Sequence, residues 1–156
     1  MIYVSKEVPV NAARGSDDPM LSRAQVWAGL KMKADNALPF VPAMTKCEVV
    51  ERSANGLTRD IEIRGEPARE RITFHPERKV VFLRLSGFAD GFIVNEILDD
   101  AAGELKMRFS FALQLVDAES DSAKEREFRT VMERDYLAAV DATLAAIRRA
   151  VKEKKL

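Results

Sequence analysis

The sequence predicts an α+β fold in which a strongly curved, seven-stranded antiparallel sheet packs around one long C-terminal helix. Three observations predict this fold: an alternating apolar segment at the N-terminus, six more strand-like segments in the middle of the chain, and an unbroken amphipathic segment at the C-terminus. The helix and the sheet each have one apolar face, and packing them together buries both faces.

One strand and a short helical region are expected at the N-terminus. Residues 2–10 alternate between apolar and polar side chains, which is typical of a half-buried strand, and residues 11–19 are expected to form a loop. Ser22 and Gln25 have the spacing of a capping box, so a helix begins after Ser22. Pro39 prevents that helix from continuing. We therefore expect one or two short helices between the first and second strands.

The central part of the chain is predicted to be an antiparallel meander. Six segments have the residue pattern of strands, and short turns rich in Gly, Pro, Asn and Asp separate them. The expected strands are residues 45–52, 57–64, 69–75, 80–86, 92–99 and 105–116. Because every connection is short, consecutive strands should pair antiparallel.

A long helix is predicted to start within a few residues of Ser122. Ser122 and Glu125 repeat the capping-box pattern, and the segment from Ala123 onward contains no Gly or Pro. Apolar residues recur there at helical spacing: Phe128, Val131, Met132, Tyr136, Val140, Leu144, Ile147 and Val151. About thirty residues make a helix of roughly 45 Å, which only the sheet is large enough to cover.

Composition and charge narrow the functional classes. The 156 residues include 25 basic and 25 acidic side chains, so the net charge is zero and nucleic-acid binding is disfavoured. The single cysteine cannot form an internal disulfide. No apolar run is long enough to span a membrane and no N-terminal targeting signal is visible. We expect a cytoplasmic protein with a single domain over residues 1–156.

Several short motifs resemble a known protein superfamily. They are Gln25-Val-Trp-Ala-Gly-Leu30, Lys33-Ala34, Phe40-Val-Pro42, Cys47-Glu-Val49, Leu57-Thr-Arg59 and Asn95. Together with the element order, they resemble the START and pollen-allergen-like (SRPBCC) superfamily, and within it a small uncharacterised family related to a protein of the acetylaranotin biosynthetic cluster. The resemblance covers essentially the whole chain and implies a START-like, helix-grip fold with a hollow beneath the last helix. It implies little about function, because this scaffold includes lipid carriers, polyketide cyclases, hormone receptors, quinone-binding proteins and co-chaperones.

The turns between strands predict which side chains line the hollow. Pairing Arg64 with Arg69 across one turn places Arg59 on the apolar face, opposite Phe74. The same pairing places Glu70 on this face, although the sequence leaves open whether Glu70 points into the hollow.

Two further turns extend the predicted lining. Pairing Gly87 with Gly91 sets Leu83 opposite Asn95, and the following hairpin sets Asn95 opposite Met107. The predicted apolar lining is Val81, Leu83, Leu85, Ile93, Ile97, Met107, Phe109 and Phe111.

Polar residues on this apolar face are the candidate ligand contacts. A buried polar group needs an internal partner, ordered water or a ligand. Arg59, Asn95 and Tyr136 meet this description, but each also has a purely structural interpretation. The head of Arg59 can reach solvent at a sheet end, Asn95 can bond to backbone or water, and Tyr136 can pack in the core. Trp27 is expected to pack where the first helix meets the sheet, and the resemblance implies that this helix lies beside the cavity mouth. The candidate ligand-binding residues are therefore Arg59, Asn95, Tyr136, Trp27, Leu83, Leu85, Met107, Phe109 and Phe111.

Catalytic and metal-binding patterns are weak. His75 is the only histidine and precedes Pro76 in a turn, which favours a structural role. Cys47 lies in phase with Val49 and is interpreted as a small buried hydrophobe. The loop acids lack the spacing of a calcium loop and the glycines form no phosphate-binding loop. We expect no metal and no cofactor.

Three functional hypotheses remain open at this point. The first is a protein that binds a small hydrophobic or amphipathic molecule in the hollow. The second is a polyketide cyclase or lyase-like enzyme that uses the same cavity. The third is a protein-interaction module whose core is filled by its own side chains. The sequence does not decide whether the protein is an enzyme.

Overall fold

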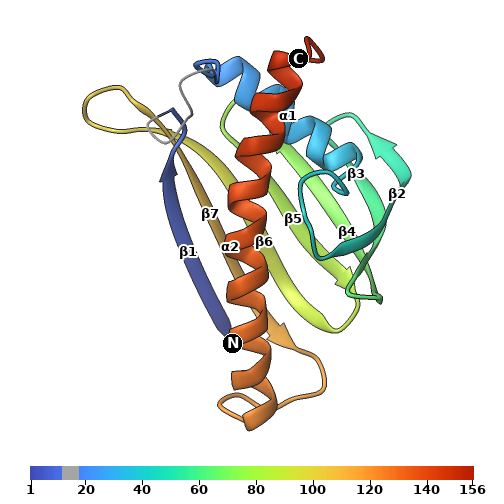
Figure 1. Cartoon of the computed structure of the whole chain (residues 1–156). Coiled ribbons are helices and arrows are strands. Elements are labelled where there is room, and N and C mark those ends of the chain that lie inside the picture. Colours follow the sequence, from blue (N-terminus) through green and yellow to red (C-terminus); the bar gives the residue numbers. More distant parts are fainter. Residues whose placement is uncertain (12–17) are drawn as a thin grey trace.

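The computed structural model describes residues 1–11 and 18–156, and these form a seven-stranded antiparallel sheet with two helices (Figure 1). The strands are β1 (Ile2–Pro9), β2 (Met44–Ser53), β3 (Gly56–Ile63), β4 (Glu66–His75), β5 (Lys79–Ser86), β6 (Ala89–Asp99) and β7 (Leu105–Leu115). The helices are α1 (Arg23–Asp35) and α2 (Ala123–Lys152). The loop expected over residues 11–19 lies, at positions 12–17, outside the described residues.

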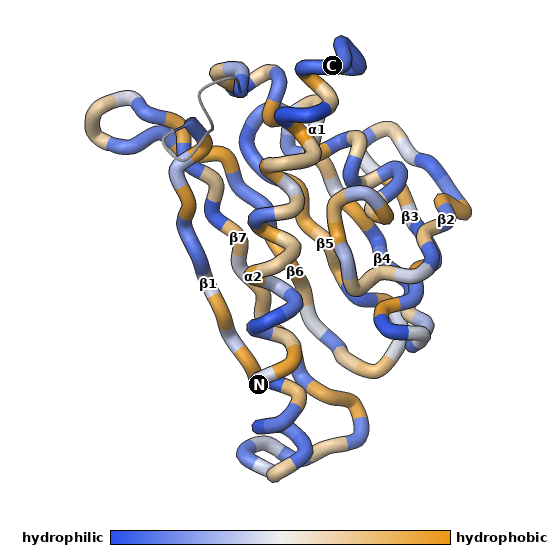
Figure 2. The backbone as a smooth tube through the Cα atoms, in the orientation of Figure 1, coloured by the Kyte–Doolittle hydropathy of each residue, from blue (hydrophilic) through white to orange (hydrophobic). Residues whose placement is uncertain are grey.

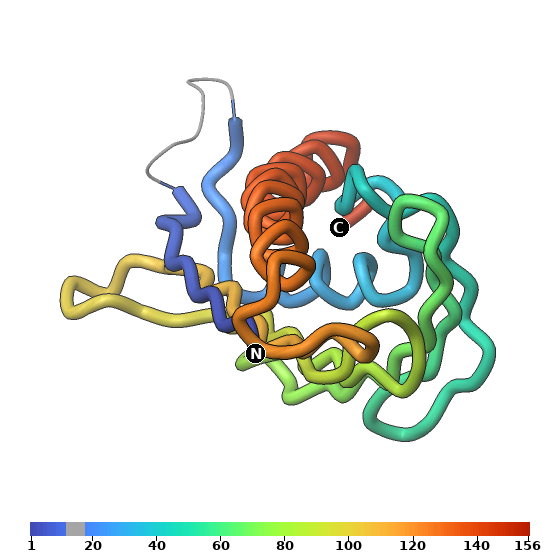
Figure 3. Tube along the Cα trace, turned by 90° about the horizontal axis from the view of Figure 1, so that it is seen from below, coloured from blue at the N-terminus to red at the C-terminus, as the bar shows by residue number. Residues whose placement is uncertain are grey.

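The sheet has the order β1-β7-β6-β5-β4-β3-β2. The six strands that follow α1 therefore pair consecutively, and β1 pairs back with β7. Seen from below, the strands curve around α2, and α1 lies on the same side of the sheet (Figure 3). This arrangement confirms the predicted seven-stranded sheet around a long C-terminal helix.

Both predicted helix starts are confirmed. Ser22 Oγ accepts a hydrogen bond from Gln25 N at 3.2 Å, and the side chain of Gln25 accepts one from Ser22 N at 2.9 Å, so the capping box is complete. Ser122 Oγ accepts from Glu125 N at 3.1 Å. Within the described residues, α1 is the single helix between β1 and β2. Residues 38–40, with Pro39 in the middle, form a turn and not a second helix.

The long helix α2 has one face on the sheet. Hydrophobic and hydrophilic residues are interspersed along its 30 residues (Figure 2). Its large buried apolar side chains, Met132, Tyr136, Val140, Leu144 and Ile147, recur at intervals of three or four residues and belong to the main core.

The hairpin between β3 and β4 is tighter than the sequence predicts. Arg64 and Gly65 form a two-residue turn with positive φ angles of 51° and 81°, as this type of turn requires. Arg59 consequently lies opposite Glu70, where the sequence placed it opposite Phe74. The error is four residues, an even number, so Arg59 still points to the inner face of the sheet.

The pairing of β6 with β7 shows an error of the same kind. Asn95 lies opposite Phe109, not opposite Met107. The offset is again even, and Asn95 is 1% exposed on the inner face.

The hairpin between β5 and β6 is different, because its register error is odd. Leu83 lies opposite Phe92 and not opposite Asn95, an offset of three residues. An odd offset moves every side chain of a strand to the other face of the sheet. Leu83 and Leu85 are accordingly 43% and 46% exposed. Their predicted orientation toward the cavity is wrong, and so is that of Val81.

The composition of β5 explains this error. Its outer face carries Val81, Leu83 and Leu85, whereas its inner face carries Val80, Phe82 and Arg84. The sequence pattern therefore favours the uninterrupted apolar side. In addition, Gly91 is not part of the turn but belongs to β6. In that strand a Cβ on Gly91 would lie 2.0 Å from the carbonyl oxygen of Ala112.

Helix α1 packs closely against α2 at Gly29. A Cβ on Gly29 would lie 2.5 Å from Cγ1 and 2.8 Å from Cδ1 of Ile147, which is fully buried. Gly29 therefore allows α1 to pack on α2 one helical turn before Lys33.

We expect Gly29→Ala to destabilise the protein by about 1 to 2 kcal/mol, because overpacking outweighs the gain of up to about 1 kcal/mol in helix propensity. Urea unfolding measures this change. In an Ile147→Ala background the same substitution should be neutral or stabilising, since the clashing atoms are gone. An equal cost in both backgrounds would show that the helix contact is not the cause.

Candidate functional site

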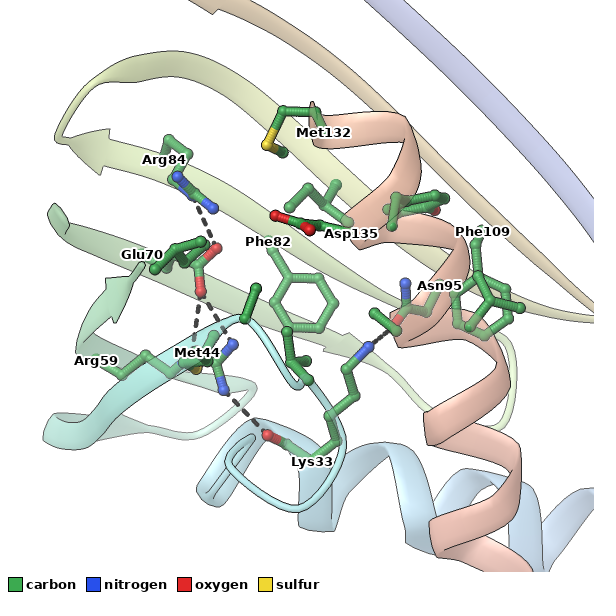
Figure 4. Close-up of a pocket in the computed structure, with 17 residues that line it drawn as sticks. Lys33, Met44, Arg59, Glu70, Phe82, Arg84, Asn95, Phe109, Met132 and Asp135 are labelled. Carbon is green, nitrogen blue, oxygen red and sulfur yellow. Dashed lines mark hydrogen bonds and ion pairs between the residues drawn. The ribbon is translucent and has the colours of Figure 1, made fainter. Parts of the chain in front are cut away.

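A cavity of about 80 Å³ lies between α1, α2 and the inner face of the sheet (Figure 4). Most of its wall is apolar, with contributions from Val41, Met44, Phe82, Ile93, Phe109, Met132 and Val140. Its polar lining residues are Lys33, Arg59, Glu70, Arg84, Asn95, Asp135 and Tyr136. The cavity thus has the mixed character of a small-molecule site, largely apolar with a few polar groups that can orient a ligand.

Three charged side chains form a row across the inner face of the sheet. Arg59 on β3 lies opposite Glu70 on β4, and Glu70 lies opposite Arg84 on β5. Glu70 Oε1 accepts hydrogen bonds from Arg59 Nε at 3.1 Å and Nη2 at 3.0 Å. Glu70 Oε2 accepts one from Arg84 Nε at 3.0 Å. All three residues are at most 5% exposed, so this is a fully buried ion-pair cluster.

The pKa of Glu70 reflects this cluster. Burial raises the pKa of the carboxyl group, but the charges and hydrogen bonds of Arg59 and Arg84 outweigh burial and hold it below its ordinary value. Glu70 is therefore a carboxylate that is already fully engaged by two arginines, which makes it a poor general base.

Arg59 is occupied by structural partners. Besides Glu70, its Nη1 donates to the carbonyl oxygens of Lys33 at 3.0 Å and Ala34 at 2.9 Å. These carbonyls lie in the last turn of α1, where they have no partner within the helix. Arg59 thus lines the cavity as predicted, while its donors fasten the end of α1 to the sheet.

Lys33 extends from α1 into the cavity (Figure 4). Its Nζ donates to Asn95 Oδ1 at 2.9 Å and lies 5.6 Å and 5.7 Å from the ring centroids of Phe82 and Phe109. Burial, followed by the charge of Arg59, lowers the pKa of Lys33 to about 7, against the opposing effect of Glu70. Lys33 can therefore gain or lose a proton near neutral pH.

Several polar atoms on the cavity wall have no hydrogen-bond partner among the described residues. They are Arg84 Nη1, Asn95 Nδ2 and Tyr136 Oη. Tyr136 packs edge-on against Phe109 and Phe111, with ring centroids at 6.3 Å and 4.7 Å, and burial raises the pKa of its hydroxyl. Unpaired buried polar groups are costly, and such groups in one cavity indicate space for water or a ligand.

The sequence-predicted site residues separate into three groups. Arg59, Asn95, Tyr136 and Phe109 line the cavity. Trp27, Met107 and Phe111 are buried in the main core, and Trp27 packs edge-on against Phe74 at 6.1 Å instead of lying at the cavity. Leu83 and Leu85 lie on the outer face.

Sequence reasoning missed several cavity residues, among them the basic residues Lys33 and Arg84. Lys33 appeared only in a motif of the family resemblance, and the register error between β5 and β6 turns Arg84 to the outer face. A signal for Lys33 exists in its spacing from Val26 and Leu30, which places it on the buried side of the helix. Arg84 has no comparable signal, since only the correct register brings it inward.

The remaining candidates for chemistry are Cys47 and possible metal ligands, and neither forms a catalytic arrangement among the described residues. Cys47 is half-buried, and its Sγ lies 3.6 Å from Arg59 Nη1. The described part of the chain contains no group of three or more His, Cys, Asp or Glu side chains that could hold a metal ion. No helix within it is long and apolar enough to cross a membrane.

An outer pocket adjoins the cavity. Its volume is about 500 Å³, and it shares Ala43 and Asp135 with the cavity wall. Arg64 in the β3–β4 turn donates to the carboxylate of Asp135 on α2, with Nε 2.7 Å from Oδ2. This ion pair therefore lies where the cavity and the outer pocket adjoin.

The sequence of the chain matches the model of a known protein family over almost its whole length. Residues 4–154 match the model of the family described as acetylaranotin biosynthesis cluster protein L. The chain belongs to this family. A comparison with curated protein sequences found no significant match.

Solved structures show how widely this family's fold occurs. The chain is similar to the Zhui aromatase/cyclase from Streptomyces sp. R1128, with a TM-score of 0.75 and 18% identity over 96% of this chain and 95% of the other. It is also similar to a START superfamily protein from Mycobacterium smegmatis, with a TM-score of 0.62 and 13% identity over 94% and 97%. A third similar structure, Ara h 8.0201, has a TM-score of 0.54 and 15% identity over 92% and 98%. At identities of 13–18% these similarities show a shared helix-grip fold and nothing about a shared role.

Proposed function

We propose that this protein binds a small hydrophobic or amphipathic molecule in the cavity between the sheet and α2. One observation carries the proposal: the cavity has an apolar wall and a polar end in which buried groups still lack partners. A filled protein core would have no reason to keep such groups unpaired. The third hypothesis, an interaction module with a filled core, is therefore less well supported.

The size of the cavity limits the ligand. Its volume of about 80 Å³ is smaller than the roughly 300–1,000 Å³ of typical ligand pockets. A molecule with about one ring fits this space, and a longer one needs the outer pocket as well. The proposal is accordingly a ligand whose polar end occupies the cavity and whose remainder extends past Asp135 toward the outer pocket.

The test is a titration with the neutral fluorescent probe N-phenyl-1-naphthylamine, with native mass spectrometry of the purified protein to detect a bound molecule. We expect saturable binding at micromolar concentration in the wild type, with one end of the probe in the cavity and the remainder in the outer pocket. Ala139→Leu directs a larger side chain from α2 into the cavity and should weaken binding at least tenfold. Ala145→Leu, on an exposed position of the same helix, is the matched control and should leave binding unchanged. Absence of saturation in the wild type would refute the proposal.

A second candidate function is a cyclase-like enzyme that uses the same cavity. It is favoured by the similarity to the Zhui aromatase/cyclase together with the amine of Lys33, which can exchange a proton near neutral pH. Turnover of a polyketide-like substrate, lost in Lys33→Met, would distinguish this function from binding alone.

A further inference from the structure

The basic side chains around the cavity outnumber the carboxylates that pair with them. Lys33, Arg59 and Arg84 face it from α1, β3 and β5, and the one carboxylate that pairs with them is Glu70 on β4. A charge that is buried without a counter-ion is strongly unfavourable, so the polar end of the cavity favours an added negative charge.

The other elements around Lys33 do not supply that charge. Helix α2 contributes Asp135 and Tyr136 to the cavity wall, but the carboxylate of Asp135 is held by Arg64 on the outside. The cavity residues on β6 and β7 are Ile93, Asn95 and Phe109, and the segment before β2 contributes Val41 and Ala43, none of which is charged. The excess of positive charge therefore belongs to the cavity itself.

The unpaired polar atoms point to the same chemistry. Arg84 Nη1 and Asn95 Nδ2 can only donate hydrogen bonds, and the hydroxyl of Tyr136 can donate as well. Lys33 uses Nζ on Asn95 Oδ1 and has further N–H groups available. The group that completes this site must accept hydrogen bonds from several directions.

We infer that the ligand of this cavity carries an anionic group, such as a carboxylate, enolate or phenolate, which accepts hydrogen bonds from the donors that line the cavity: Lys33 and Asn95 on one side of Phe82, Arg84 on the other, and Tyr136 on α2 (Figure 4). The inference rests on the proposed function and adds the chemical class of the ligand to it. Water can satisfy the donors, but it does not balance the charge, so water alone leaves the site incomplete. Arg84 is the arginine that contacts the ligand, because the donors of Arg59 are already committed to Glu70 and to the end of α1.

Binding of an anion should be coupled to protonation of Lys33. Without ligand the pKa of Lys33 is about 7, so the amine is mostly neutral at pH 8.5. An anion in contact with Nζ favours the ammonium form, and the complex therefore takes up a proton as it forms. At pH 6 the lysine is already charged and this uptake disappears.

The experiment compares three molecules of similar shape that displace N-phenyl-1-naphthylamine: 2-isopropylnaphthalene, 2-acetylnaphthalene and 2-naphthoate. They present no acceptor, a neutral acceptor and an anionic acceptor, respectively. We expect naphthoate to bind at least about tenfold more tightly than the ketone, which is the scale of a charge-assisted hydrogen bond. Calorimetry in buffers of different ionisation enthalpy should show uptake of close to one proton per naphthoate at pH 8.5 and none at pH 6.

Variants test the assigned contacts. Arg84→Met should weaken naphthoate at least about tenfold and leave 2-isopropylnaphthalene almost unaffected, and Lys33→Met should abolish the proton uptake. Leu83→Met, on the outer face of the same strand, is the matched control for Arg84→Met. The charge preference and the proton uptake are measured on the wild type, so they stand even where a variant folds poorly.

The outcomes separate the two proposals. If the neutral probe binds but naphthoate has no advantage over the ketone and no proton is taken up, the anionic ligand is excluded and hydrophobic binding remains. If neither the probe nor any of the three molecules binds, both proposals fall.

Discussion

Glu70→Gln should lower the free energy of unfolding by about 3 to 5 kcal/mol, the cost of leaving a buried ion without its partner. Glu70 accepts three hydrogen bonds from Arg59 and Arg84, and the substitution leaves two guanidinium groups buried without a counter-charge. The amide of Gln has nearly the shape of the carboxylate, so the loss is due to charge and not to volume. Urea unfolding at pH 7 measures it.

A matched variant and a pH series isolate the cause. Glu66→Gln lies on the same strand in an exposed position and should change stability by no more than about 0.5 kcal/mol. Because Arg59 and Arg84 hold the pKa of Glu70 below its ordinary value, its contribution is complete near neutral pH and is lost as the pH falls through that lowered pKa. The difference between wild type and Glu70→Gln should therefore shrink in acid. A loss that is small at pH 7, or equal at all pH values, would contradict the ion-pair explanation.

The fold was predictable because its signals are local and agree with one another. The capping box at Ser22, the alternation in the strands and the unbroken helical pattern after Ser122 each depend on a few neighbouring residues. Tertiary packing had only to bring these elements together, and the apolar faces specify how. The strand registers are a different matter, because they depend on where each turn lies to within one residue.

In the candidate site, an error in strand register decides whether a side chain is predicted on the correct face of the sheet. Arg59 and Asn95 were placed correctly on the inner face, because the errors in their hairpins were even. The error between β5 and β6 was odd, so Leu83 was turned inward and Arg84 outward. A strand that is apolar on both faces carries no pattern that corrects such an error.

The row of Arg59, Glu70 and Arg84 could therefore not be predicted from the sequence. It exists only when three strands are aligned so that these residues lie opposite one another. A register four residues away sets Arg59 opposite Phe74 and hides the carboxylate that Arg59 binds. The sequence could predict that a buried arginine needs a partner, but not which residue the partner is.

The free energy of unfolding should rise with pH by about 1 kcal/mol or more per pH unit between pH 7.5 and 9.5 in the ligand-free protein. The reason is Lys33, whose pKa is lowered by burial to about 7 in the folded protein and returns to its ordinary value of about 10.4 on unfolding. Between these two values the unfolded chain binds one proton more than the folded chain, so a higher pH favours the folded state. About one pH unit below the pKa of the folded state, both states are protonated at this group and the slope vanishes.

The comparison of Lys33→Met with Lys31→Met decides whether Lys33 is responsible for this slope. Lys31 is exposed on the same helix, so its substitution should keep the slope, whereas Lys33→Met should remove it. The series stops at pH 9.5 because burial raises the pKa of Tyr136, which makes high pH favour the unfolded state once tyrosines ionise there. At pH 7 Lys33→Met should be as stable as the wild type or more so, since removing a buried ionisable group often relieves a desolvation cost. If the slope persists in Lys33→Met, the amine of Lys33 does not titrate near neutral pH and the proton coupling inferred for ligand binding fails with it.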